Sequence, residues 1–431
     1  MPQVAIRNGM CAVADARRMD FDAVPVSSFW NTGEGKEAKI HRIHAYPAKF
    51  PAFIASKAIE FAKCENVRLD WIADIFCGCG TVAFEAKRNS INFWGCDINP
   101  VATMIARTKS RRYRTKKLLS YFESILDEYE RIKVGCDLYD SANERLRYWY
   151  SREQFEELSN LKLAIENSVP SSSDYHLFFL CAFSNILKST SRWLTKSIKP
   201  QIDPIKKPAN VLYAFKEQCL FMISTNTEND AASTTKTEIV TANFLDKSVK
   251  RPKVNMIITS PPYVTSYEYA DLHQLSSLWL QYANDYRELR DGSIGSLHHV
   301  YNFDRELKRL NNTGTGIVFR LLEKDKSQAR SVAKYFLDMQ SVAKSCHSML
   351  SCGGMALFVI GNTEYMGIRM ENARHLTESL LESGFDKVHV TKRHIRGKIL
   401  TPYRDDRGRF TSDNNGRKVY GEEFIVIGRK R

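Results

Sequence analysis

The sequence predicts an α/β protein of the doubly wound type, interrupted by a large insertion that is mostly helical. Three observations lead to this prediction. Short apolar runs typical of buried strands alternate with helical patterns in two parts of the chain, turns rich in glycine or proline follow some of these runs, and a long stretch between the two parts has helical spacing with little strand signal. Successive strand–helix–strand units of this kind build a parallel sheet covered by helices.

The first α/β part is expected over residues 39–110. Residues 71–76 (WIADIF) have the composition of a buried strand, and Cys77-Gly-Cys-Gly80 is a turn before a helix. Proline at position 100 suits the first turn of the helix that follows the next strand. The expected elements are helices over 52–63, from Thr81 and from Pro100, and strands over 71–76 and 91–96.

The insertion is expected over residues 111–236, and the second α/β part over 237–431. Residues 1–38 carry mixed small and polar residues, so we expect a flexible N-terminal segment there. The expected helices of the insertion lie over 117–133, 141–168, 174–195 and 208–223. The expected strands of the second part lie over 237–242, 254–259, 355–360, 386–393 and 422–428, with helices over 328–350 and 371–384.

The composition limits the classes of protein to which the chain can belong. The chain has 431 residues, of which 43% are hydrophobic and 26% charged, as is ordinary for a globular domain. It has no apolar run near the roughly 20 residues that span a bilayer, and no apolar stretch near its start, so we expect a cytoplasmic protein without a membrane partner. The ten cysteines form no Cys-x-x-Cys pair, so we expect no metal site. The net charge of +14 favours a polyanionic partner, although a solvated basic surface has the same composition.

The segment Asp74-Ile-Phe-Cys-Gly-Cys-Gly-Thr81 is the first candidate for a binding site. It joins a strand to a helix, where glycines let the backbone approach a ligand and the helix N-terminus offers free N–H groups. Its glycine spacing departs from the usual dinucleotide pattern. Asp97 ends the next strand, where a carboxylate can accept hydrogen bonds from both ribose hydroxyls of a nucleoside or can cap the following helix.

The segment Thr259-Ser-Pro-Pro-Tyr263 is the second candidate, directly after the strand 254–259. Two prolines cannot continue a central strand, so the chain leaves the sheet at its carboxyl edge, where open α/β sheets bind ligands. The exocyclic amine of a base is a weak nucleophile because its lone pair is conjugated into the ring. Ser260 Oγ and a proline-flanked carbonyl can accept its two hydrogens and turn that lone pair toward a methyl donor, while Tyr263 can stack on an extruded base.

With these segments in this order, the chain resembles the amino-methyltransferases of DNA, especially the Ser-Pro-Pro-Tyr group that methylates cytosine N4. The resemblance covers residues 40 to 428. It is most specific at His44-Ala-Tyr-Pro-Ala-Lys-Phe-Pro51, at Asp74 to Thr81 and at Ser260 to Tyr263, which are similar to the family's motifs X, I and IV. Asp97 matches the acidic residue of motif II. Asn243 lies where motif III often has an acidic residue, so this position departs from the family.

The resemblance implies a Rossmann-like methyltransferase sheet of seven strands, S-adenosyl-L-methionine as the cofactor and double-stranded DNA as the partner, read by base flipping. A cognate restriction endonuclease is a possible further partner. The implied catalytic residues are Ser260, Pro261, Pro262 and Tyr263. The implied cofactor-binding residues are Tyr46, Pro47, Lys49, Phe50, Asp74, Phe76, Cys77, Gly78, Gly80, Thr81, Asp97, Ile98 and Asn243.

Target recognition has several candidate locations in the sequence, namely the insertion, residues 264–320 and the basic stretch 392–409. Tyr267 is a candidate for the base pocket. Two basic stretches are candidates for phosphate contacts, or for the solvated ends of their elements, and their residues are Arg111, Arg112 and Arg114 in one, and Lys392, Arg393, Arg396 and Lys398 in the other.

The sequence bears differently on the alternatives to cytosine-N4 methylation. Cytosine C5 methylation needs a nucleophilic cysteine, usually after proline, and the sequence contains no Pro-Cys dipeptide. Adenine-N6 methylation is the nearest alternative, since the amine chemistry is the same, but its motif usually begins with Asp or Asn rather than serine. RNA or protein-amide methylation, and a catalytically silent DNA-binding scaffold, remain further alternatives.

Overall fold

The structure is a computed structural model. It describes residues 9–33, 36–47, 49–132, 137–229, 235–264, 269–294, 301–395, 403–404, 410–411, 417–418 and 421–431. Within these residues, no helix is both long enough and apolar enough to cross a bilayer.

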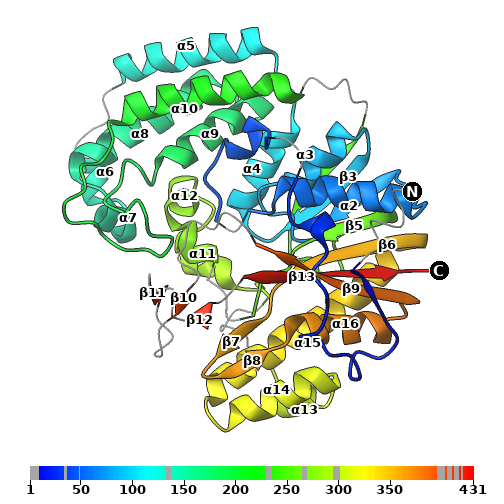
Figure 1. The fold of residues 1–431 in the computed structure, drawn as a ribbon. Coiled ribbons are helices and arrows are strands. Elements are labelled where there is room, and N and C mark those ends of the chain that lie inside the picture. The colour runs from blue at the N-terminus through cyan, green and yellow to red at the C-terminus, as the bar shows by residue number, and fades with distance from the viewer. Residues whose placement is uncertain are drawn as a thin grey trace.

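A mixed sheet of eight strands forms the centre of the molecule (Figure 1). β2 to β6 are parallel to one another, whereas β13, β9 and β1 continue the sheet in antiparallel pairs. Across the sheet, the strands are β1 (Cys11–Val13), β9 (Lys387–His394), β13 (Glu422–Arg429), β6 (Leu350–Ile360), β5 (Val254–Thr259), β2 (Trp71–Asp74), β3 (Asn92–Asp97) and β4 (Thr237–Thr241). All seven strands expected from the sequence are present, and the predicted doubly wound α/β fold is confirmed.

The eighth strand, β1, comes from the N-terminal segment that was expected to be flexible. Cys11 to Val13 pair with the outer edge of β9, and Val26 forms a further bridge with Lys392. The side chains of Phe21, Val24 and Trp30 are buried against the sheet and its helices. The sequence does not predict this ordered segment, because its apolar residues occur singly and follow neither the strand period of two nor the helix period of 3.6. The segment is ordered instead by pairing with the free edge of β9, which is distant in the chain.

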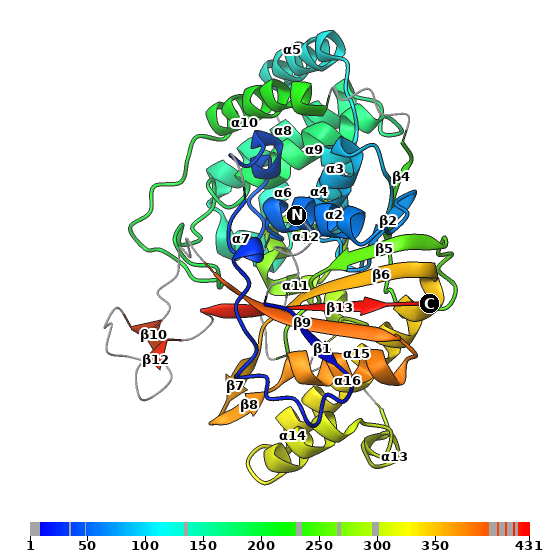
Figure 2. The same ribbon diagram turned by 45° about the vertical axis from the view of Figure 1, so that its right-hand side comes forward.

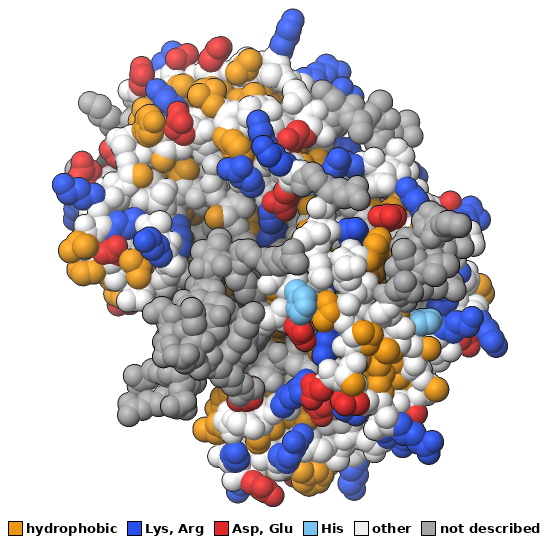
Figure 3. Space-filling view, in the orientation of Figure 1, with side chains coloured by type: hydrophobic (Ala, Val, Ile, Leu, Met, Phe, Trp, Pro, Cys, Tyr) orange, Lys and Arg blue, Asp and Glu red, His pale blue; other side chains and the backbone are white. Residues whose placement is uncertain are grey.

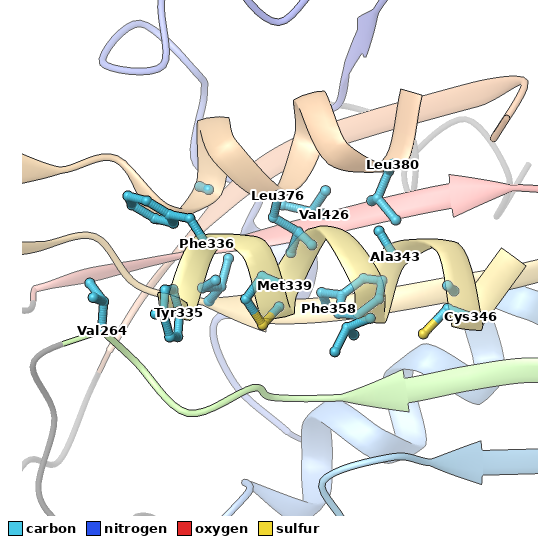
Figure 4. Close-up of a cluster of buried hydrophobic side chains, with 14 of the residues drawn as sticks. Val264, Tyr335, Phe336, Met339, Ala343, Cys346, Phe358, Leu376, Leu380 and Val426 are labelled. Carbon is cyan, nitrogen blue, oxygen red and sulfur yellow. The ribbon is translucent and has the colours of Figure 1, made fainter. Parts of the chain in front are cut away.

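Helices cover both faces of the sheet, and alternate side chains of the strands supply the two cores. On one face, Ile72 and Ile258 pack with α2 (Ala52–Cys64) and α3 (Thr81–Arg88). On the other, Phe358 and Val426 pack with α15 and α16, as Figure 4 shows. The helices beside this second face are α13 (Phe303–Leu307), α14 (Asn312–Leu322), α15 (Lys326–Met349) and α16 (Asn372–Glu382).

The insertion forms a helical layer with its own core, which extends to α4 (Pro100–Ser110) and α12 (Gln274–Trp279) (Figures 1 and 2). Its helices are α5 (Thr115–Arg131), α6 (Asp137–Asp140), α7 (Glu144–Trp149), α8 (Arg152–Ser168), α9 (Asp174–Ile186) and α10 (Val211–Thr225). The single helix expected over 141–168 is two helices, because Ser151 caps α8 by accepting a hydrogen bond from Gln154 N. The helix expected over 174–195 ends at Ile186, and an irregular connection follows it.

The remaining elements are short. One is the helix α11 (Tyr269–Leu272), which follows β5 in the chain. The others are the 3-10 helices η1 (Ser28–Trp30), η2 (Lys39–Arg42), η3 (Asn226–Asn229) and η4 (Tyr286–Arg290), and the strand pairs of β7 (Thr363–Tyr365) with β8 (Ile368–Met370), and of β10 (Tyr403–Arg404) with β11 (Phe410–Thr411) and β12 (Arg417–Lys418).

Candidate active site

The carboxyl ends of β2, β3 and β5 lie side by side at one edge of the sheet. The chain passes from β2 outward to β3 and β4, and then returns to place β5 on the other side of β2. The strand order therefore reverses between β2 and β5, which is where open α/β sheets bind ligands. Asp74, Asp97 and Thr259 are the last residues of these three strands, so the structure brings the two segments selected from the sequence to a common edge.

A buried hydrogen bond joins the ends of β2 and β5. Thr259 Oγ1 donates to Asp74 Oδ1 over 2.6 Å, and Phe76 N donates to the same oxygen over 3.1 Å. Burial raises the pKa of Asp74 to about 7, and these two hydrogen bonds only partly offset that effect. Asp74 thus ties the glycine turn to the residue that precedes Ser260.

The glycine turn closes around the end of β3. Gly78 N donates to Asp97 Oδ2 over 2.9 Å, and both Gly78 and Gly80 have positive φ angles, of 46° and 76°. Gly80 precedes the first turn of α3, where a Cβ atom would lie 2.7 Å from Ala106 Cβ in α4. Glycine is therefore required at position 80 by both its backbone conformation and its neighbour.

Asp97 is not the cap of α4. That role belongs to Asn99, whose side chain accepts a hydrogen bond from Val101 N over 2.9 Å. Asp97 Oδ1 accepts from Asn99 N, and burial raises the pKa of the Asp97 carboxyl. Because each carboxylate oxygen has two lone pairs, Asp97 keeps acceptor capacity beyond its two backbone partners.

Two aromatic rings cover the glycine turn. The Tyr46 ring stacks on the His273 ring with centroids 5.0 Å apart, and a Cβ atom at Gly78 would lie 3.5 Å from the Tyr46 ring. Burial lowers the pKa of His273 to about 3, so this imidazole is neutral at physiological pH. Its Nε2 atom is buried without a hydrogen-bond partner among the described residues.

The rest of the motif X segment contacts η2 and the core beside α2. Lys49 Nζ donates to Glu37 Oε2 over 2.7 Å and to the His41 carbonyl oxygen over 3.2 Å. Pro47 is half-buried, and Phe50 packs against the core beside α2 and α3. The Lys49 ammonium is therefore held by two residues that precede the motif X segment.

The remaining residues proposed for the cofactor lie around the same turn. Phe76 is partly buried, whereas Cys77 and Thr81 are buried at the ends of the turn. Asn243, two residues after β4, donates from Nδ2 to the Gly292 carbonyl oxygen over 3.0 Å, and a Cβ atom at Gly292 would lie 3.3 Å from Ile98 Cδ1. Ile98 and Asn243 thus share the loop at Gly292 as a neighbour.

The Ser-Pro-Pro-Tyr segment is held from two sides. Tyr335 in α15 donates its hydroxyl to the Pro262 carbonyl oxygen over 2.9 Å. Tyr263 donates its hydroxyl to Glu423 Oε1 over 3.1 Å, and a Cβ atom at Gly361 would lie 3.0 Å from the Tyr263 ring. Burial and the Glu423 carboxylate raise the pKa of Tyr263 well above its ordinary value of 10.0, so this hydroxyl remains a donor.

Two acceptors of this segment stay available. Within the described part of the chain, neither Ser260 Oγ nor the Pro261 carbonyl oxygen has a hydrogen-bond partner. Since Pro262 and Tyr263 are both held in place, the orientation of these two acceptors is set by the neighbouring residues rather than by a ligand.

Two of the basic residues proposed for DNA contacts are buried, which corrects the expectation for them. Lys392 and Arg393 are buried in β9, where Lys392 Nζ donates to the Asp22 carbonyl oxygen over 2.8 Å. Arg393 donates to Glu423 Oε2 from Nε over 3.0 Å and from Nη2 over 2.6 Å. A buried, paired guanidinium is not available to a phosphate, so Arg393 supports Glu423 and, through it, Tyr263. The sequence shows the charges but not the opposing carboxylate on β13.

The other basic group lies far from the site. Arg111, Arg112 and Arg114 are exposed after the end of α4, and Arg111 Nε lies 3.5 Å from Asp174 Oδ1. Because α4 starts at the carboxyl edge of the sheet and runs back along it, its last turn lies toward the opposite edge. Tyr267, Arg396 and Lys398 lie outside the described residues.

Sequence reasoning did not single out the residues that support the site. Glu423, Tyr335 and Gly361 come from three distant segments and belong to no motif; only the pairing of β13 with β9 and β6 brings two of them near Tyr263. Among the described residues, no group of three or more His, Cys, Asp or Glu side chains is placed to hold a metal ion. A cavity of about 620 Å³ between α13, α15 and α16 contains none of the predicted site residues.

Comparisons with known proteins point to methyltransferases of DNA. A family model described as DNA methylase matches residues 6–107, which include the glycine turn and Asp97 but end before Ser260. The type II methyltransferase M.MvaI of Kocuria varians is 25% identical over 354 residues, covering 75% of this chain and 76% of that protein. The type II methyltransferase M.MjaII of Methanocaldococcus jannaschii is 27% identical over 119 residues, which cover 27% of this chain and 22% of that protein.

Among solved structures, the rRNA methyltransferase aviRa from Streptomyces viridochromogenes covers 97% of this chain and 96% of its own, with 10% identity and a TM-score of 0.28. A TM-score of 0.28 is too low to support a shared fold, so the α/β fold of this chain is assigned from its own strand order. The family model and the first relative together support a DNA amino-methyltransferase, and they do not distinguish cytosine N4 from adenine N6.

Proposed function

We propose that this chain transfers a methyl group from S-adenosylmethionine to the N4 amine of cytosine in double-stranded DNA. The observation that carries the proposal is the pair of acceptors Ser260 Oγ and Pro261 O, which lack partners among the described residues at the edge where Asp74 and Asp97 end their strands. Serine in place of Asp or Asn at the start of the motif favours cytosine over adenine.

The residues around the glycine turn fit the methyl donor. The turn has no side chain at Gly78 and Gly80, and a Cβ atom at Gly78 would already contact the Tyr46 ring at 3.5 Å, so glycine leaves the backbone of the turn open to a ligand. Asp97 offers acceptors for the ribose hydroxyls. When bound, S-adenosylmethionine supplies an electrophilic methyl group on a sulfonium ion.

The catalytic segment then prepares the nucleophile. Ser260 Oγ and Pro261 O accept hydrogen bonds from the two amine N–H groups, which makes the nitrogen more tetrahedral and directs its lone pair out of the base plane. As the nitrogen–carbon bond forms and the carbon–sulfur bond of the donor breaks, the nitrogen releases one of its two protons to solvent. Tyr263 offers a flat surface to a base that has been rotated out of the duplex. Its hydroxyl bond to Glu423 holds the ring, so the chain contributes positioning rather than a covalent intermediate.

The type II relatives extend the proposal to a biological role. We propose that methylation is confined to one recognition sequence, and that a restriction endonuclease reading the same sequence is the partner. DNA methylated by this chain would then resist that endonuclease.

Incubation of the chain with methyl-labelled S-adenosylmethionine and either duplex DNA or RNA tests the substrate class. Label is expected in DNA only, and it should be lost in Ser260→Ala but kept in Ser327→Ala, which changes an exposed serine of α15. Calorimetry should show that Ser260→Ala still binds the cofactor. Label in RNA alone, or full activity of Ser260→Ala, would contradict the proposal.

A further inference from the structure

The connection between α9 and α10 is a strongly basic segment of the insertion that the proposed function has not yet used. Residues 188–207, here called the basic loop, contain six Lys or Arg residues and a single acid, Asp203. Four of the six side chains are exposed, and these belong to Arg192, Lys196, Lys199 and Lys207. Figure 3 shows Lys and Arg side chains on this side of the insertion, interspersed with acidic and hydrophobic ones.

The basic loop is ordered by ring stacking and by backbone hydrogen bonds. The Trp193 ring stacks on the Trp149 ring of α7 with centroids 4.9 Å apart and planes 20° apart. The backbone pairs with itself, because Leu194 N donates to Gln201 O over 2.8 Å and Asp203 N donates to Arg192 O over 2.9 Å. Charges on an ordered loop lose less entropy on binding than charges on a loose one.

The two lysines that are not exposed hold the loop together from inside. Lys188 Nζ donates to the carbonyl oxygens of Thr195 and Ser197 over 3.2 and 2.7 Å. Lys206 Nζ donates to those of Lys188 and Trp193, both over 2.8 Å, and burial lowers the pKa of Lys206 to about 8. Lys188 and Lys206 therefore stabilise the loop, whereas Lys196, Lys199 and Lys207 are exposed to solvent.

A short chain of contacts connects the basic loop to the active site. Trp149 Nε1 donates to Gln274 Oε1 in α12 over 2.9 Å, and the neighbouring His273 stacks on Tyr46 above the glycine turn. In Figures 1 and 2, α7, α11 and α12 all lie beyond the carboxyl ends of the parallel strands. The loop therefore lies on the side of the molecule from which a duplex must approach Ser260.

Arg192 holds the loop on α7, because its Nη2 atom donates to the Tyr148 carbonyl oxygen over 2.8 Å. We propose that the basic loop binds the phosphate backbone of duplex DNA through Lys196, Lys199 and Lys207, and so positions the duplex over the catalytic edge. This inference rests on the proposed function, since it takes the substrate to be DNA. Of the basic residues expected from the sequence, Lys392 and Arg393 are buried, and Arg111, Arg112 and Arg114 lie toward the opposite edge. Contacts of this kind fix the position of a duplex without reading its sequence.

The test compares two triple variants by titration of a labelled duplex at several salt concentrations. Lys196→Gln, Lys199→Gln and Lys207→Gln together remove three charges of the loop. The matched control removes three exposed charges near the amino ends of the strands, through Lys247→Gln, Lys250→Gln and Lys344→Gln. Retained S-adenosylmethionine affinity and an unchanged thermal transition show that each variant is folded.

We expect the loop variant to bind DNA on the order of tenfold more weakly, equally for duplexes of any sequence. Its slope of log K against log salt should become shallower by about 0.9 for each lysine that no longer neutralises a phosphate, and thus by about 2.7 for all three. The control should match the unaltered chain. Equal binding by both variants, or an equal decrease in both, would overturn the role of the loop while leaving the proposed function intact. If the unaltered chain binds no DNA at any salt concentration, the proposed function fails together with the inference.

Discussion

Replacement of Asp74 by asparagine tests the link between the cofactor turn and the catalytic strand. Asp74 is buried, and its pKa is raised from 3.8 to about 7. The folded state therefore holds the proton more tightly than the unfolded chain does. The protonated carboxyl contributes stability that is complete below pH 3.8 and is lost as the pH rises through 7.

The size of this effect follows from the two pKa values. A rise from 3.8 to about 7 corresponds to about 4 kcal/mol over the full range, of which about 2.5 kcal/mol falls between pH 5 and pH 8. Asparagine carries no charge at either pH. The free energy of unfolding of Asp74→Asn, relative to the unaltered chain, should therefore rise by about 2.5 kcal/mol from pH 5 to pH 8.

Urea denaturation followed by circular dichroism at the two pH values measures this difference. Asp70→Asn, four residues upstream, is the matched control because that carboxylate is exposed. The other titrating groups are common to all three proteins and cancel in the comparison. If Asp74→Asn differs from the unaltered chain by the same free energy of unfolding at pH 5 and pH 8, then burial does not raise the pKa of Asp74.

Three further substitutions probe the site. Asp97→Ala should weaken S-adenosylmethionine binding by about 10- to 100-fold in calorimetry, since charged hydrogen bonds contribute about 1.5–3 kcal/mol; unchanged affinity would remove Asp97 from the cofactor site. Gly80→Ala should lower the free energy of unfolding by about 2–4 kcal/mol, because Gly80 has a positive φ and a Cβ atom there would collide with Ala106 in α4. Gly353 has a similar φ but open space around it, so Gly353→Ala should show the cost of the backbone strain alone. Equal destabilisation by the two substitutions would exclude the collision with α4. Glu423→Gln should slow methyl transfer while leaving DNA affinity unchanged, because Tyr263 loses a charged partner; an unaltered rate would show that this hydrogen bond does not position Tyr263.

The local sequence was sufficient for the elements with a regular apolar pattern. β2, β3, β4 and β5 could be predicted because each is a short apolar run followed by a turn, and the strand ends carry Asp74, Asp97 and Ser260 to a common edge. The break at Ser151 was missed because a capping serine inside a long helical pattern resembles a solvent-facing residue.

The parts that could not be predicted depend on partners far apart in the chain. β1 exists because β9 has a free edge, nearly 380 residues later. Arg393 was expected to face DNA, but its opposite neighbour in the sheet is Glu423, and this register cannot be read from either segment alone. The same holds for the basic loop, whose lysines divide into buried and exposed groups only once Trp193 is stacked on Trp149.

Mass spectrometry of nucleosides tests the central claim most directly. Duplex DNA is incubated with the chain and with S-adenosylmethionine carrying a deuterated methyl group, and is then digested to nucleosides. The account predicts deuterated N4-methylcytosine with the unaltered chain and none with Ser260→Ala. Label in N6-methyladenine would keep the amine site but contradict the choice of cytosine. Label at cytosine C5, or no labelled nucleoside at all, would contradict the role of the Ser-Pro-Pro-Tyr segment.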